Sequence, residues 1–237
     1  MYDYTSMSLY YDLIMKSGYY NYEKIVDNFE KCGENFDSIL EIGCGTGLIL
    51  QELGKRYLQT DITGIDFTAA MLSIAAKRLQ EFPKISLLHQ NVTALDLEKS
   101  YDLAFSYGGV WYFVVNSHQE PFLVSHLDRK EENRTGLAHV ARHVKTGGRL
   151  LLGTQGPHYN YAKTVSNGMI YSQKIDSTQI GFDKQYYITR NGEVVMAQTI
   201  NYRTYDWPSA LDLLSEAGFS LLSATDQSEG FMVFVKA

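Results

Sequence analysis

Three glycines at alternate positions, Gly43, Gly45 and Gly47, follow a short apolar run that carries Glu41 near its end. Glycine lets the backbone turn tightly and approach a ligand closely, because it has no Cβ and tolerates positive φ. A glycine-rich turn between a strand and a helix is where α/β proteins place a nucleotide-like ligand. The sequence therefore predicts a ligand site at residues 43–47.

The spacing of these glycines narrows the choice of ligand. A dinucleotide fingerprint reads Gly-x-Gly-x-x-Gly, whereas residues 41–47 read Glu-x-Gly-x-Gly-x-Gly. A carboxylate is unfavourable beside a pyrophosphate but suits a ligand that carries an ammonium group. The pattern resembles motif I of the class I S-adenosylmethionine (SAM) methyltransferases, whose ligand has both an ammonium and a sulfonium. The alternative is an ordinary glycine-rich turn.

Asp66 stands about 20 residues after the glycines, at the end of a second predicted strand. A carboxylate there can accept both hydrogens of a ribose diol. The resemblance implies this role, since an acid at this position holds the ribose of SAM in the family. The alternative is an Asp that caps the next helix. Phe67 is expected either at the adenine edge or in the core.

Asn91 and Val92 follow the third predicted strand. Family members commonly have an Asp and a small apolar residue here, with the carboxylate on the adenine amino group. This chain departs from that pattern, but the amide of Asn91 still offers an acceptor oxygen and the Val92 backbone an N–H donor. The resemblance therefore implies adenine contacts at both positions.

The segment that follows the fourth predicted strand, residues 106–113, lies where methyl transfer occurs in this family. Gly108 and Gly109 would admit a ligand close to the backbone, and the aromatic side chains could bracket a sulfonium by cation–π attraction. Many relatives have a histidine near the position of Trp111, and this chain has none. Alternatively, Trp111 and Phe113 belong to the core.

The N-terminal segment Tyr10-Tyr11-Asp12-Leu13 resembles the stretch that opens small-molecule methyltransferases and folds over the cofactor. Tyr11 and Tyr22 are the preferred candidates for binding the methionine carboxylate. The other interpretation is a tyrosine-rich amphipathic helix that only packs on the sheet. The chain has 18 tyrosines, a residue type that suits pockets and interfaces.

These inferences give one set of candidate site residues. The cofactor-binding candidates are Tyr11, Tyr22, Glu41, Gly43, Cys44, Gly45, Gly47, Asp66, Phe67, Met71, Asn91, Val92 and Ser106, and the catalytic candidates are Tyr107, His118 and His158. The two histidines are chosen because each lies in a loop on the expected active-site side. His139 and His143 are one helical turn apart, but no third ligand lies nearby in sequence, so no metal site is predicted.

The elements that must position these residues alternate between strand and helix. We expect strands at 38–42, 61–66, 85–90, 101–106 and 149–153, with helices at 48–53, 68–79 and 137–144, the last closed by Gly147-Gly148. A hairpin of 185–190 and 193–205 around Asn191-Gly192, a helix at 209–217 and strands at 219–224 and 231–235 complete the chain.

This alternation predicts an α/β fold with a Rossmann-like, doubly wound, seven-stranded sheet and a final antiparallel hairpin. We expect a single domain, in which an inserted antiparallel segment acts as a lid or an interface. Its parts are an N-terminal cap at 1–30, a SAM-binding core at 36–155, the insertion at 156–205, and a C-terminal helix with strands at 206–237.

The composition of the chain limits the classes of partner that it is expected to bind. With 45% hydrophobic and 20% charged residues and a net charge of −6, the chain reads as a soluble globular protein that is unsuited to nucleic acid. The longest apolar runs fall short of a membrane span. The two cysteines, Cys32 and Cys44, provide no disulfide framework, and residues 1–5 have no signal-peptide character, so we expect a cytoplasmic protein. A monomer or a homodimer is expected.

The function predicted from these features is transfer of a methyl group from SAM to nitrogen or oxygen of a small-molecule acceptor. The missing histidine near Trp111 favours nitrogen, because an amine can arrive neutral and needs no general base. The layout is similar to those of glycine and sarcosine N-methyltransferases and of amino-sugar N,N-dimethyltransferases. The alternatives are an NAD(P)-dependent oxidoreductase and a non-catalytic SAM-binding partner subunit.

Overall fold

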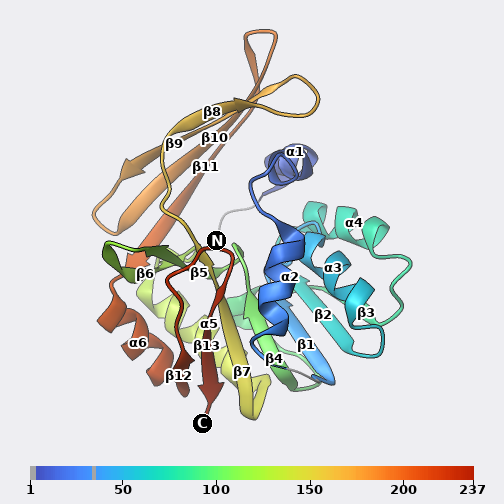
Figure 1. Cartoon of the computed structure of the whole chain (residues 1–237), viewed down its shortest axis with the longest axis vertical. Helices are drawn as coiled ribbons and strands as arrows, with labels where there is room; N and C mark the ends of the chain where they lie inside the picture. Colours follow the sequence, from blue (N-terminus) through green and yellow to red (C-terminus); the bar gives the residue numbers. More distant parts are fainter. Residues whose placement is uncertain (1–3, 34–35) are drawn as a thin grey trace.

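A seven-stranded sheet forms the body of the molecule in the computed structural model, which describes residues 4–33 and 36–237 (Figure 1). Its strand order is β3-β2-β1-β4-β7-β13-β12, with parallel pairing up to β7 and antiparallel pairing beyond it. The strands are β1 (Ser38–Ile42), β2 (Asp61–Asp66), β3 (Ile85–His89), β4 (Tyr101–Ser106), β7 (Val144–Gln155), β12 (Phe219–Ser223) and β13 (Phe231–Lys236). The predicted Rossmann-like sheet with a final antiparallel hairpin is confirmed.

Helices cover both faces of this sheet, as doubly wound folds require. Successive residues of a strand point to opposite faces, so Ile39 and Leu40 of β1 belong to two separate hydrophobic clusters. The cluster of Ile39 includes residues of α2 (Tyr22–Glu30), α3 (Leu48–Arg56) and α4 (Ala69–Arg78). The cluster of Leu40 includes residues of α5 (Lys130–Arg142) and α6 (Trp207–Glu216).

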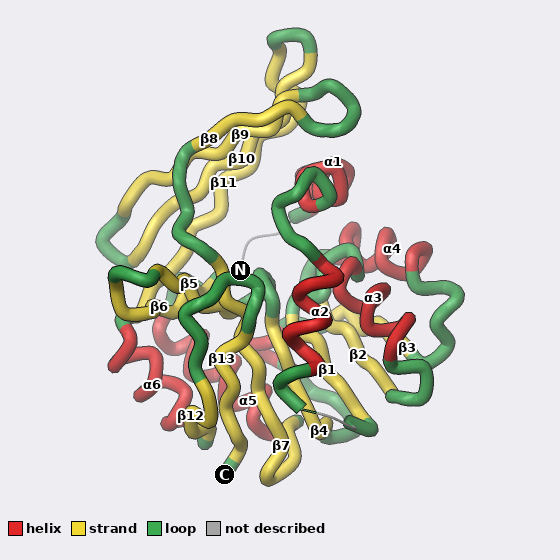
Figure 2. Tube along the Cα trace, in the orientation of Figure 1, coloured by secondary structure: helices red, strands yellow, loops and turns green. Residues whose placement is uncertain are grey.

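A second, antiparallel sheet extends from the carboxyl end of β7 and rises away from the helical layer (Figure 2). Its order is β7-β5-β6-β11-β10-β9-β8, with a parallel pair between β7 and β5 and antiparallel pairs from β5 onward. The added strands are β5 (Trp111–Asn116), β6 (Gln119–Ser125), β8 (Tyr161–Thr164), β9 (Ile170–Ser177), β10 (Gly181–Arg190) and β11 (Glu193–Tyr205). This sheet contains the predicted hairpin around Asn191-Gly192, and its first two strands precede the expected insertion.

The segment after β4 is therefore a short loop at residues 107–110 followed by strand β5. Trp111 and Phe113 are fully buried in the core, and the Trp111 indole Nε1–H donates to Asn133 Oδ1 at 2.8 Å. Both residues are unavailable to bracket a sulfonium, so the alternative reading of them as core residues holds.

The boundary between α5 and β7 also differs from the prediction. Gly147 and Gly148 do not close a helix; they lie within β7, where the register against β4 shifts between Tyr101 and Leu103. Val144, expected in the helix, already pairs with Tyr101. Strand pairing with β4 decides the local conformation here, because the irregularity absorbs the two glycines without ending the strand.

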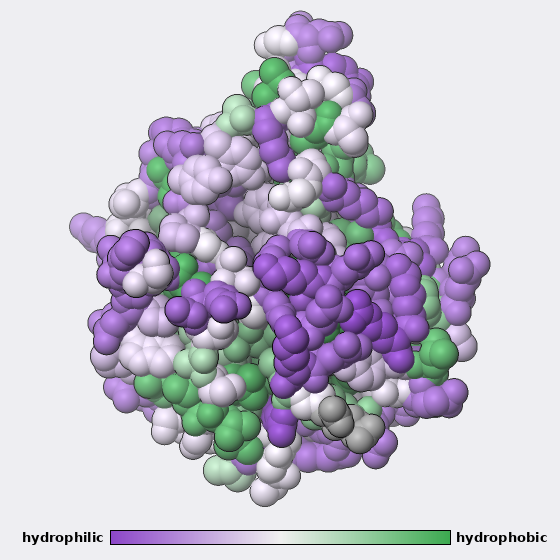
Figure 3. Space-filling view, in the orientation of Figure 1, coloured by the Kyte–Doolittle hydropathy of each residue, from purple (hydrophilic) through white to green (hydrophobic). Residues whose placement is uncertain are grey.

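Helix α1 (Thr5–Met15) packs against both α4 and β11, and so spans the gap between the two sheets (Figure 1). The face shown in Figure 3 is hydrophilic over α2, with apolar residues interspersed near the far end of the antiparallel strands and gathered around β12 and β13. Within the part of the chain that the structure describes, every helix is too short or too polar to cross a lipid bilayer.

Replacing Gly47 with Ala tests how tightly the turn before α3 is built. Gly47 has φ +77°, and a Cβ on it would lie 2.9 Å from Leu79 Cδ1 and 3.2 Å from Ala75 Cβ. Gly147 has nearly the same φ, +76°, but a Cβ there meets nothing within 4 Å. In both Ala variants the new Cβ is placed in a left-handed backbone conformation, which costs about 1–2 kcal/mol. Overpacking should lower the free energy of unfolding of Gly47→Ala by about 1–3 kcal/mol more than that of Gly147→Ala, as measured by urea unfolding. Equal losses would contradict close packing at this turn.

Candidate active site

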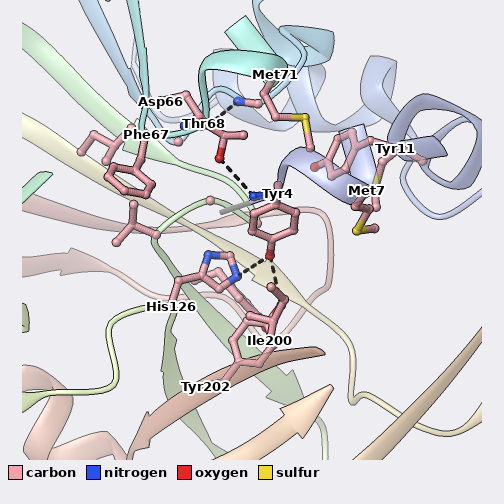
Figure 4. Close-up of a pocket in the computed structure, with 18 of the residues that line it drawn as sticks. Tyr4, Met7, Tyr11, Asp66, Phe67, Thr68, Met71, His126, Ile200 and Tyr202 are labelled. Atoms are coloured by element: carbon pink, nitrogen blue, oxygen red, sulfur yellow. Dashed lines mark hydrogen bonds between the residues drawn. The ribbon is translucent and has the colours of Figure 1, made fainter. Parts of the chain in front are cut away.

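A cavity of about 960 Å³, open solvent at its mouth included, lies between the carboxyl ends of the central parallel strands and the antiparallel sheet. Ligands of doubly wound folds bind at this edge of the sheet. Residues from the loops after β1, β2 and β4 line one side of the cavity, and residues of β10 and β11 line the other. Figure 4 shows Asp66, Phe67, Thr68 and Met71 across the cavity from His126, Ile200 and Tyr202, with Tyr4 between them.

The glycine loop is held by backbone hydrogen bonds to the neighbouring strand. The N–H groups of Gly43 and Cys44 both donate to the carbonyl of Ile65, at 2.8 and 2.9 Å. Gly43 also packs against the loop after β4, since a Cβ on it would lie 3.0 Å from Gly109 Cα. The loop therefore presents backbone, without side chains, to the floor of the cavity.

Asp66 joins the glycine loop to the start of α4. Its Oδ2 accepts the Gly45 N–H at 2.9 Å, and its Oδ1 accepts the Thr68 N–H at 2.7 Å. Burial raises the pKa of Asp66, and the two backbone donors oppose that rise. Each carboxylate oxygen keeps a further lone pair for a ligand hydroxyl.

Glu41 lies beneath the loop with a carboxylate oxygen, Oε2, that has no hydrogen-bond partner within residues 4–33 and 36–237. The side chain is 2% exposed. Burial, together with the negative charge of Asp66, raises the pKa of Glu41 well above its ordinary value. Two carboxyl groups therefore lie close together on this side of the cavity, and a cationic ligand would relieve their repulsion.

An ion pair fastens α1 over the glycine loop. The Thr46 hydroxyl donates to Asp12 Oδ1 at 2.7 Å, and the Arg78 guanidinium donates both to the Asp12 carboxylate and to the Thr46 carbonyl. Tyr11, next to Asp12, lies over Gly45: its ring and hydroxyl are 3.9 Å from the position of a Cβ on that glycine. Asp12 thus positions the predicted cap residue Tyr11.

The structure brings about half of the predicted site residues to the cavity wall. Those that line it are Tyr11, Gly43, Gly45, Asp66, Phe67, Met71, Val92 and His158. Cys44 and Gly47 belong to the loop, and Glu41 lies below it, but none of these three lines the cavity. Tyr22 also lies outside the lining, although its pKa is raised by burial and by the nearby charges of Asp12 and Glu41.

The remaining predicted residues lie elsewhere. The side-chain oxygen of Asn91, Oδ1, accepts from the Thr93 N–H and hydroxyl, at 3.0 and 2.9 Å, and Gln90 lines the cavity instead of Asn91. Ser106 is buried and accepts the Trp111 N–H.

Two of the three predicted catalytic residues are also away from the lining. Tyr107 donates to the Thr154 carbonyl at 3.3 Å. His118 is exposed at the turn between β5 and β6.

The wall formed by the antiparallel sheet is rich in tyrosines and contains one lysine, Lys184 of β10, that the sequence analysis missed. Its Nζ lies 2.6 Å from the Tyr19 hydroxyl and 4.9 Å from the centre of the Tyr186 ring. The residue is 1% exposed, and no Asp or Glu in the described ranges forms an ion pair with it. Burial lowers the pKa of Lys184 to about 7.

Two histidines share this wall with Lys184. His126 lies 3.5 Å from the Tyr4 hydroxyl, and His158 Nε2 is hydrogen bonded to the Tyr112 hydroxyl at 2.9 Å. Burial, followed by the charge of Lys184, lowers the pKa of each imidazole to about 3. Both histidines are therefore neutral and weakly basic at pH 7.

A protein-family model described as a methyltransferase domain matches residues 39–148. Malonyl-(acyl-carrier protein) O-methyltransferase of Priestia megaterium is 39% identical over 69 residues, which are 29% of this chain and 25% of that protein. The chain therefore spans about a quarter of the length of the curated relatives it matches first.

Solved structures resemble the whole chain. DesVI of Streptomyces venezuelae has a TM-score of 0.72 and 19% identity, with 98% of each chain covered. SAM-bound CalS10, an amino pentose methyltransferase of Micromonospora echinaspora, has a TM-score of 0.67 and 17% identity, with 96% of each chain covered. At such identities the likeness is one of fold, and it includes the antiparallel sheet.

The buried lysine should make stability depend on pH. Because folding lowers the pKa of Lys184, the unfolded chain binds the extra proton between about pH 7 and 10, so unfolding becomes less favourable as the pH rises through this window. Between pH 7 and 10, the free energy of unfolding of the wild type should rise by up to about 4 kcal/mol relative to that of Lys184→Met, as measured by urea unfolding at each pH. Parallel pH curves for the two proteins would contradict a charge cost at this position.

Proposed function

We propose that the chain, in which residues 39–148 match a family model described as a methyltransferase domain, transfers a methyl group from SAM to a small-molecule acceptor, to nitrogen or else to oxygen. The observation that carries the proposal is the cluster of Asp66 and the glycine loop, with Glu41 beneath the loop, at one end of the cavity. The chemistry of this cluster complements both the ribose and the cationic part of SAM.

The chain's own groups fit this cofactor. Asp66 has a spare lone pair on each oxygen for the two ribose hydroxyls, while backbone N–H groups fix its orientation. The unpartnered oxygen of Glu41 supplies an acceptor for the ammonium group. We assign the adenine contacts to Phe67, Val92 and Gln90, which line the same side of the cavity, and the role of a cover to Tyr11.

The methyl group is already activated when SAM is bound, since a sulfonium is an excellent leaving group. The nucleophile's lone pair forms the new bond to carbon, the C–S bond breaks, and sulfur keeps its electron pair as a neutral thioether. A methylated amine then loses a proton to solvent. The protein's contribution is to hold the two reactants in line and to exclude water.

The cavity favours an amine as the nucleophile. The two imidazoles that line it, His126 and His158, are too weakly basic to activate a hydroxyl. We assign to His158 the role of orienting Tyr112, its hydrogen-bond partner, rather than that of a general base.

Calorimetric titration with S-adenosylhomocysteine (SAH) and with NADH tests the cofactor assignment. SAH should bind saturably and NADH should not. Asp66→Ala should weaken SAH binding by about 100-fold or more, since hydrogen bonds to a carboxylate are worth about 1.5–3 kcal/mol. Asp61→Ala is the matched control, because Asp61 begins the same strand but is exposed and pairs with Lys84. Unchanged affinity in Asp66→Ala, or binding of NADH, would contradict the assignment.

A panel of small amines and their hydroxyl analogues, assayed with methyl-labelled SAM, tests the nucleophile. Amines should be methylated at least about ten times faster, because the two imidazoles that line the cavity are too weakly basic to activate a hydroxyl. His118→Ala should retain wild-type turnover, since its side chain lies at an exposed turn. Loss of turnover in His158→Ala with intact SAH binding would show that a histidine base is needed. SAH binding without turnover on any acceptor would favour the non-catalytic alternative.

A further inference from the structure

Lys184 is an unusual residue to find on the wall of this cavity. It stands on β10 directly opposite Ile200 of β11, and opposed residues of an antiparallel pair share a face of the sheet. Ile200 and its neighbour Tyr202 face the cavity, as Figure 4 shows. The amino group of Lys184 therefore projects into the half of the cavity that faces away from Asp66.

A buried lysine is ordinarily paired with a carboxylate, because removing an ammonium group from water costs several kcal/mol. The groups that face Lys184 include two phenols, Tyr19 and Tyr186, and the two imidazoles already described. None of these is an anion at neutral pH, since burial raises the pKa of both phenols above the usual range. The charge partner of Lys184 is thus absent from the described residues of the chain.

Other hydrogen-bond donors lie on the same part of the wall. Gln155 is 7% exposed, lines the cavity, and has an Nε2 with no hydrogen-bond partner within residues 4–33 and 36–237. This Nε2 and the Tyr20 hydroxyl lie 3.1 and 2.7 Å from the position of a Cβ on Gly108. The Tyr19 and Tyr20 rings are in contact, with centroids 4.8 Å apart, so donors extend from Lys184 to Gln155.

The cavity is also divided by charge. Asp66 is the one carboxylate among the described residues that line it, and it belongs to the cofactor side with Glu41 behind it. The opposite side has a lysine, an unpaired amide donor and several phenols, but no acid. A neutral or cationic acceptor would leave Lys184 unpaired, whereas an anion would satisfy it.

We propose that Lys184, together with Tyr19 and Gln155, binds an anionic group of the acceptor, a carboxylate or a phosphate, while the nucleophile points toward SAM. The inference rests on the proposed function for the identity of the reaction, but the anion site itself is measurable without it. The acceptor class is then a small amine that bears a negative charge, such as an amino acid or a phosphorylated amine.

Binding of such an anion is coupled to a proton. An anion beside Lys184 favours its ammonium form, so a lysine that is neutral in the empty cavity becomes charged when the anion enters. At pH 8, a group of pKa about 7 should take up about 0.9 protons per anion bound. A structural lysine without a ligand would show no such uptake.

Calorimetry of the SAH-saturated protein tests the site, with acetate and inorganic phosphate as the probes. Acetate has no titrating group at pH 8, so titrations in two buffers of different ionisation enthalpy report proton uptake by the protein. Saturable binding of acetate supports a carboxylate site, and binding of phosphate alone supports a phosphate site. Absence of saturable binding for both anions at tens of millimolar would overturn the proposal.

Variants identify the residue responsible. Lys184→Met should lower the affinity for the anion at least about 10-fold and abolish proton uptake. Lys174→Met is the matched control, because Lys174 is an exposed lysine of the adjacent strand β9, paired with Asp176. Tyr19→Phe keeps the ring, and it should weaken binding several-fold without removing proton uptake. Equal anion affinity in wild type and Lys184→Met would refute the assignment.

Two further measurements separate the possible failures. Unchanged SAH affinity and a single cooperative unfolding transition in Lys184→Met show that the variant is folded, so a loss of anion binding is then local. The acetate and phosphate titrations are repeated without SAH. If the wild type binds an anion but not SAH, the proposed function fails and the anion site is supported. If it binds SAH but no anion, the anion site fails and the proposed function is not contradicted.

Discussion

The arrangement of the cofactor side depends on one carboxylate that is tied to two turns. Asp66 accepts backbone N–H groups from Gly45, in the loop after β1, and from Thr68, at the start of α4. These bonds fix the ends of two neighbouring parallel strands against each other and keep the carboxylate aimed at the cavity. The glycines permit this approach, because a side chain at Gly43 would collide with the backbone after β4. Backbone geometry and ligand chemistry are therefore determined by the same contacts.

The cavity joins two sheets whose chemistry differs. The parallel sheet contributes carboxyl groups with raised pKa values, Glu41 and Asp66, whereas the antiparallel sheet contributes Lys184 with a lowered pKa. Each group is disfavoured in its charged form by burial, and each would be stabilised by a ligand of opposite charge. A cationic cofactor and an anionic acceptor thus bind to opposite walls, and the mismatch of charge discourages either from occupying the other's place.

Local sequence patterns were sufficient to predict the parallel sheet. They predicted much less of the acceptor wall, which is the side of the cavity formed by the antiparallel sheet. The glycine spacing and the distance to Asp66 depend on neighbouring residues of one strand–turn–helix unit, so they could be read directly. Lys184 was missed because the predicted strand began at Gln185, whereas β10 begins four residues earlier, at Gly181. The alternation Phe182, Lys184, Tyr186 along β10 was the available signal, since it places a lysine on an otherwise apolar face.

Strand β5 was missed because nothing local distinguishes its apolar run from a loop at the active site. Its pairing with β7 and β6 determines that this run forms a strand.

Tyr4 shows how the two walls can influence each other. Its backbone N–H donates to Thr68 Oγ1 on the cofactor side, and its hydroxyl lies 3.5 Å from both His126 and Tyr202 on the acceptor side (Figure 4). Thr68 is also the residue whose N–H orients Asp66. Tyr4, at the start of α1, is thus held by both walls at once. Since the Asp12–Arg78 ion pair anchors α1 over the glycine loop, a displacement of α1 would alter the cofactor wall and the acceptor wall together.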